Sequence, residues 1–169
     1  MKNNQEQELS CYKRLQEESL RGGRLLYLGA LLQRGAYLFP EQLALITEER
    51  FLSYKELYFR ALLLSRTLAQ KGVFYGDRVV IYYENSAEFV IAYFAILQIG
   101  AIAVPVNTFL HTKELAYVIQ DAAPKLIVVS KAFASSLELI LEQGFMEKLP
   151  DQVNSSDFDW VSSYNESLV

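Results

Sequence analysis

The chain has 169 residues, of which 51% are apolar, with a formal net charge of −4 and an isoelectric point of about 5.1. This length predicts one domain, and the composition supplies enough apolar residues for a packed core. Lysine and arginine are scattered singly, which argues against a nucleic-acid partner. Cys11 is the only cysteine, which excludes an internal disulfide and a cysteine-cluster zinc site. We therefore expect a reduced, cytoplasmic setting.

Residues 1–22 form a polar N-terminal segment that lacks the basic start and apolar run of a signal peptide. The longest apolar stretch, 89–97, is about half of the roughly 20 residues that a membrane-spanning helix needs. No membrane span is therefore predicted, and 89–97 is expected to lie in a buried helix.

The first predicted elements are a helix over 24–37, ended by Pro40, and a β-hairpin of 43–47 with 51–54. Ser53, followed three residues later by Glu56, predicts a capping box at the start of the next helix. Arg60 is assigned to the positions of this helix that lie off its apolar face, and Gly72 is placed to end it. The apolar face itself consists of Leu57, Ala61, Leu64 and Leu68.

Strands and helices alternate over 77–149. Nearly continuous apolar runs predict buried strands at 77–83, 101–106 and 125–130. Asn85 or Ser86 is expected to cap a helix that ends near Ile99, and Thr112 to cap one that ends near Ala122. A last amphipathic helix is predicted over 132–149, and a loose polar connector over 151–169. The fold class is therefore α/β, with a mainly parallel sheet flanked by helices and a leading hairpin.

Few residues have the type and setting that catalysis or metal binding needs. His111 is the only histidine, but no nearby residue could orient it, and a loop histidine is usually solvated. Cys11 lies in the polar N-terminal segment, where an incidental thiol is the favoured interpretation over a reactive one. The acidic pairs at 17–18 and 48–49 are interpreted as solvent-facing charges rather than a general acid and base.

The glycines fit neither phosphate-binding motif, and the predicted strand-to-helix turns contain none. A dinucleotide site of the Rossmann type is therefore not expected. The pairs 85–86 (Asn-Ser) and 107–108 (Asn-Thr) follow the carboxyl ends of strands, where open sheets bind ligands. Helix capping also explains them and is the favoured alternative. Most of the eleven tyrosines follow core-facing patterns, and they lack the interleaved basic residues that base stacking requires.

Five stretches resemble one enzyme family in order and spacing. They are 45–46 with 52–57 (Leu-Ser-Tyr-Lys-Glu-Leu), 76–79 with 84–89, 96–101 through 104–107, 112–115, and 125–129. Together, from about 31 to 129, they are similar to the AMP-forming adenylating enzymes: acyl-CoA synthetases, peptide-synthetase adenylation domains and luciferases. The resemblance implies the N-terminal subdomain of such an enzyme, with 23–150 as an α/β unit and 151–169 leading toward a phosphate loop.

The family resemblance also implies a reaction. A carboxylate attacks the α-phosphate of ATP with Mg²⁺ present, giving an acyl-adenylate and pyrophosphate, and the acyl group then passes to a thiol, commonly that of CoA. The family's phosphate loop, its aromatic-threonine-glutamate segment, its ribose-binding aspartate and its C-terminal lysine have no counterpart in this sequence. No catalytic, cofactor-binding or metal-ligating residue can therefore be carried over.

Two hypotheses follow. In the first, the chain is the N-terminal piece of an acyl-CoA synthetase-like enzyme whose partner is the rest of that enzyme and whose substrate is a carboxylic acid. By itself it is then expected to be inactive, to bind ATP, Mg²⁺ and CoA weakly at best, and to self-associate through exposed apolar surface. In the second, it is a free-standing, non-enzymatic binding or assembly module. Neither the acyl substrate nor the acceptor thiol can be predicted.

Overall fold

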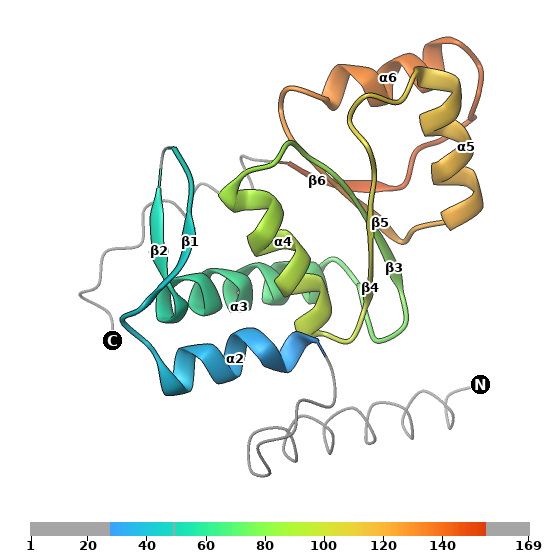
Figure 1. Cartoon of the computed structure of the whole chain (residues 1–169). Helices are drawn as coiled ribbons and strands as arrows, with labels where there is room; N and C mark the ends of the chain where they lie inside the picture. The colour runs from blue at the N-terminus through green and yellow to red at the C-terminus, as the bar shows by residue number, and fades with distance from the viewer. Residues whose placement is uncertain (1–27, 49, 155–169) are drawn as a thin grey trace, which may run out of the picture.

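A computed structural model describes residues 28–48 and 50–154 of the chain. Its centre is a four-stranded parallel sheet with helices on both faces, and a two-stranded hairpin precedes this sheet (Figure 1). The predicted α/β fold, with its parallel sheet, flanking helices and leading hairpin, is confirmed. Residues 23–27, which begin the predicted α/β unit of 23–150, lie outside the described part of the chain. The predicted polar segment 1–22 lies outside it as well.

The hairpin leads directly into a helix. Strands β1 (Leu43–Ile46) and β2 (Phe51–Ser53) pair antiparallel, and α3 (Tyr54–Gln70) starts at the next residue. The predicted capping box is present: the Ser53 N–H donates to Glu56 Oε2 at 2.8 Å, and the Glu56 N–H donates to Ser53 Oγ at 3.2 Å. Gly72 follows the end of α3 with φ at +82°, a conformation that favours glycine. Both ends of this helix are therefore specified by local sequence.

The sheet has the strand order β4-β3-β5-β6. Its strands are β3 (Arg78–Tyr82), β4 (Ile102–Pro105), β5 (Leu126–Val129) and β6 (Asp151–Asn154). The two central strands are buried on both faces, which explains their nearly continuous apolar sequences. After β3 the chain adds β4 on one side of it and then crosses over to add β5 on the other side. The direction of winding therefore changes between β3 and β5.

Two separate cores cover the two faces of the sheet. Val79 and Ile81 point into a core shared with α3 and α4 (Ala87–Gln98), whereas Val80 and Tyr82 point into a core shared with α5 (Thr112–Ala122) and α6 (Ala134–Glu142). Helix α2 (Gly29–Leu38) packs on α3 and α4. In Figure 1, α4 lies between the hairpin and the sheet. The space between hairpin and α4 is therefore close to one end of the sheet.

Two predicted segments differ from the structure. The last helix ends at Glu142 instead of 149, because Gly144, with φ at +71°, stops it: its N–H donates to Leu141 O, and the Phe145 N–H donates to Ile140 O. The loose connector is wrong for 151–154, which form β6. This strand is polar because it is a short edge strand, and only Val153 on it is fully buried.

Of the two predicted helix caps, the one for α4 is confirmed, since Ser86 was one of its two candidates, and the one for α5 differs by a residue. The N-cap of α4 is Ser86, whose Oγ accepts from the Phe89 N–H at 3.2 Å, so Asn85 is left free of that role. The N-cap of α5 is His111 instead of Thr112, and the His111 N–H donates to Glu114 Oε2 at 2.9 Å. Glu114 lies three residues after His111, which is the spacing of a capping box and marks His111 as the residue before the helix.

Candidate cleft at the carboxyl end of the sheet

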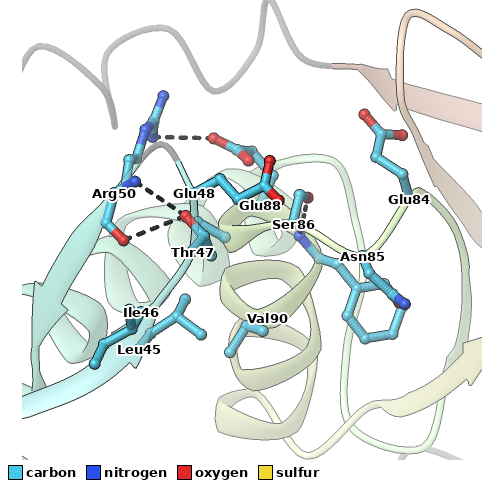
Figure 2. Close-up of a pocket in the computed structure, with 12 residues that line it drawn as sticks. Leu45, Ile46, Thr47, Glu48, Arg50, Glu84, Asn85, Ser86, Glu88 and Val90 are labelled. Carbon is cyan, nitrogen blue, oxygen red and sulfur yellow. Dashed lines mark hydrogen bonds and ion pairs between the residues drawn. The ribbon is translucent and has the colours of Figure 1, made fainter.

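A cleft of about 770 Å³ separates the hairpin from the start of α4 (Figure 2). One wall is the end of β1 and the turn that follows it, including Leu45 and Ile46. The other wall is the β3–α4 loop with the first turn of α4, including Asn85 and Ser86. The cleft therefore lies beyond the carboxyl end of β3, in the region where open parallel sheets bind their ligands.

Hydrogen bonds within the hairpin turn fix one wall of the cleft. The Thr47 N–H donates to Arg50 O at 2.8 Å, and Thr47 Oγ1 accepts from the Arg50 N–H at 3.0 Å. The Thr47 hydroxyl also donates to Arg50 O at 3.2 Å. These bonds hold the backbone of Arg50, whose side chain reaches across to α4.

An ion pair joins the two walls. Arg50 Nη1 lies 3.0 Å from Glu88 Oε1, and the two side chains are 32% and 23% exposed. Glu88 is in the first turn of α4, where a carboxylate interacts favourably with the partial positive charge of the helix N-terminus. The pair spans the gap between the hairpin turn and α4 at this end of the cleft.

A second hollow, of about 510 Å³, adjoins the first and shares Glu84, Asn85 and Phe89 with it. Its other side is the loop after β4, where Asn107 Oδ1 accepts from the Phe109 N–H at 3.0 Å. The structure thus brings together 85–86 and 107–108, the two pairs singled out in the sequence. Ser86 caps a helix, as favoured, and Asn107 closes a turn, whereas no hydrogen bond of the Asn85 side chain is seen within the described residues.

Of the other candidate residues, Glu48 lines the cleft, whereas His111 lines neither hollow. His111 starts α5, and Glu48 is an exposed residue on the cleft wall. Cys11, the pair 17–18 and Glu49 lie outside the described residues. Within 28–48 and 50–154, acidic, histidine and cysteine side chains form no group of three able to hold a metal ion. In the same part of the chain, none of the helices has both the length and the apolar character that crossing a membrane requires.

Arg60 is a functional candidate that the sequence analysis placed wrongly. It is 8% exposed and lies inward on α3, close enough to the cleft's ion pair for the charges of Arg50 and Glu88 to act on it. Burial lowers the pKa of Arg60, and Arg50 lowers it further, whereas Glu56 and Glu88 oppose this. Arg60 lies three residues after Leu57 and four before Leu64, and residues at these spacings share one face of a helix. This spacing is the signal that predicts its inward position.

Comparison with known proteins agrees with this architecture. The model of the AMP-binding enzyme family matches residues 32–168, beyond the 31–129 inferred from motifs. The 3-hydroxybenzoate/4-hydroxybenzoate CoA ligase of Thauera aromatica is 36% identical over 117 residues, which are 69% of this chain and 22% of the ligase. Tyrocidine synthase 1 of Brevibacillus parabrevis is 33% identical over 115 residues, 68% of this chain and 10% of the synthase.

Solved structures give the same result. The anthranilate CoA ligase AuaEII, in complex with anthranoyl-AMP, superposes with a TM-score of 0.72 at 28% identity, over 85% of this chain and 28% of that one. The O-succinylbenzoate coenzyme A synthetase of Bacillus subtilis, in complex with ATP and magnesium ion, gives 0.65 at 27% identity, over 79% and 34%. The chain spans about a third or less of the relatives and structures compared. On this evidence the chain belongs to the AMP-binding enzyme family.

Proposed function

We propose that this chain is the N-terminal part of an ATP-dependent, AMP-forming acid–thiol ligase of the acyl-CoA synthetase kind. The observation that supports this most strongly is the family match over 32–168, together with a fold shared with CoA ligases solved with anthranoyl-AMP and with ATP and magnesium. The complete enzyme would activate a carboxylic acid as its acyl-adenylate and transfer the acyl group to a thiol such as that of CoA. Its location would be cytoplasmic.

The proposal also states what this chain contributes. Adenylation requires groups that hold the triphosphate and neutralise the charge that develops on the α-phosphate. Arg50 is the arginine on the wall of the large cleft, and its guanidinium is paired with Glu88. The described residues contain no glycine-rich strand-to-helix turn that could hold phosphates. We therefore assign to this chain a scaffold role, with ATP, Mg²⁺ and CoA bound mainly by the rest of the enzyme.

Pyrophosphate release tests this assignment. The 169-residue chain is incubated with ATP, Mg²⁺ and a panel of aliphatic and aromatic carboxylic acids, with the Thauera aromatica hydroxybenzoate CoA ligase as the positive control. We expect acid-dependent pyrophosphate from the control and none above background from the chain. Acid-dependent release by the chain would overturn its inactivity, because the scaffold would then hold its own phosphate-binding groups.

A second candidate function is a free-standing binding or assembly module. The observation that favours it is that, within the described residues, helices cover both faces of the sheet and the outer strand β6 is short and polar. Limited proteolysis separates the two proposals. Rapid trimming of 155–169 back to β6 favours a piece of a larger enzyme, whereas a tail that resists cleavage around 160–164 favours the module.

A further inference from the structure

Three charged side chains belong to elements that pack together: the hairpin packs on α3, and α3 packs on α4. Arg50 belongs to the hairpin turn, Arg60 to α3 and Glu88 to the first turn of α4. Arg50 and Glu88 form the ion pair that crosses the cleft, with Nη1 and Oε1 3.0 Å apart (Figure 2). Because each residue belongs to a different element, the pairing among them determines how these elements are joined.

Two of the three guanidinium nitrogens of Arg60 lack hydrogen-bond acceptors within the described residues. Its Nε and Nη1 atoms are buried, and neither has an acceptor among the described residues. A buried charged group without partners is costly, and such groups in native proteins are normally hydrogen-bonded. A nearby carboxylate that turned toward Arg60 would therefore lower the free energy of the folded chain.

Two carboxylates are near enough for their charge to act on Arg60, and they differ in how firmly they are held. Glu56 Oε2 accepts from the Ser53 N–H at 2.8 Å in the capping box, so moving it would uncap α3. Glu88 is held by a partly exposed ion pair with Arg50, and exposed pairs of this kind contribute about 0–1 kcal/mol. Glu88 is thus the acceptor that is more easily released.

We propose that Glu88 is a shared acceptor that exchanges between Arg50 on the hairpin and the buried Arg60 on α3. When Glu88 pairs with Arg50, the hairpin is tied to the first turn of α4. When it pairs with Arg60, that tie is released and the buried guanidinium gains an acceptor. The loss of one pair is offset by the gain of the other, so two arrangements of the cleft wall are close in free energy. This exchange requires no nucleotide or acid and is independent of the proposed function.

A mutant cycle in two backgrounds tests the exchange. The equilibrium unfolding of the 169-residue chain is measured for R60M, E88Q and the double variant, first with Arg50 present and then with R50A added. We expect weak coupling between positions 60 and 88 while Arg50 competes for Glu88. With R50A, the coupling should grow until it corresponds to a factor of about ten in the unfolding equilibrium constant. This is the size expected for hydrogen bonds between charged groups. R66M, at an exposed position of the same helix, is the matched control and should show no coupling to E88Q.

The Nε–H resonance of Arg60 gives a second readout that does not depend on stability. In a ¹⁵N–¹H spectrum of the folded chain, R50A should shift this resonance and slow its exchange with solvent, and E88Q should abolish both effects. R66M should leave it unchanged. The proposal is overturned if coupling between 60 and 88 is equally weak in both backgrounds, or if R50A leaves the Arg60 resonance where it was.

Discussion

The ring of Tyr54 packs against the backbone of Gly35, so α2 and α3 meet at a point with no space for a side chain. A Cβ atom built on Gly35 would lie 2.3 Å from Cδ1 and 2.6 Å from Cε1 of this ring. Tyr54 is the tyrosine of the stretch 52–57 on which the family resemblance depends. Its role in this chain is therefore structural: it is the first residue of α3 and a contact surface for α2.

We expect Gly35→Ala to destabilise the chain. Alanine is favoured over glycine in a helix by about 1 kcal/mol, but overpacking against the Tyr54 ring costs about 1–3 kcal/mol, so a net loss of about 1 kcal/mol is predicted. Urea unfolding measures the change. The control is the same substitution in a Y54A background, where the ring is absent and G35A should be neutral or stabilising. An equal loss in both backgrounds would show that the ring is not the cause.

At the scale of elements, the capping box of α3 yields the clearest prediction. Ser53→Ala removes the oxygen that accepts from the Glu56 N–H, and the loss of an N-cap of this kind costs about 1 kcal/mol. Ser53→Thr keeps a hydroxyl at the same place and should retain most of that stability. Both variants are compared with the parent chain by urea unfolding. If S53A and S53T are equally stable, the box contributes nothing measurable to α3.

The sequence predicts the elements whose ends are marked by local chemistry. Ser53 with Glu56 and the glycine at 72 place α3 to within a residue, and the apolar runs locate β3, β4 and β5. Prediction fails where tertiary context decides. Strand β6 was missed because an edge strand needs only one buried side chain, here Val153, and so resembles a polar loop. The last helix was extended too far because the positive φ of Gly144 is a property of the folded backbone.

Much of the candidate site could not be predicted from the sequence, because it depends on contacts between distant segments. The pairs at 85–86 and 107–108 were found from their places after strands, but their meeting in adjoining hollows follows from the pairing of β3 with β4. The ion pair between Arg50 and Glu88 joins residues 38 positions apart and has no local signal. The burial of Arg60 was predictable from helical spacing and was missed because arginine is usually exposed.

For the whole molecule, the exposed apolar residues of the hairpin predict self-association. Ile46 and Phe51 face each other across the hairpin and are 65% and 64% exposed. In a larger enzyme such a pair would be covered, whereas in the isolated chain it is available to a second copy. We therefore expect the sedimentation coefficient of the 169-residue chain to rise with protein concentration.

The variant I46T/F51T should reduce this concentration dependence, because threonine is β-branched and therefore suits a strand, yet it removes the apolar contact. Phe74→Thr is the matched control: Phe74 is also 65% exposed, but it lies in the loop between α3 and β3, away from the hairpin. If F74T reduces association as much as the hairpin variant, general surface apolarity is the cause. A chain that stays monomeric at every concentration would contradict the prediction and favour the self-contained module, since a free-standing domain must tolerate its own exposed surface.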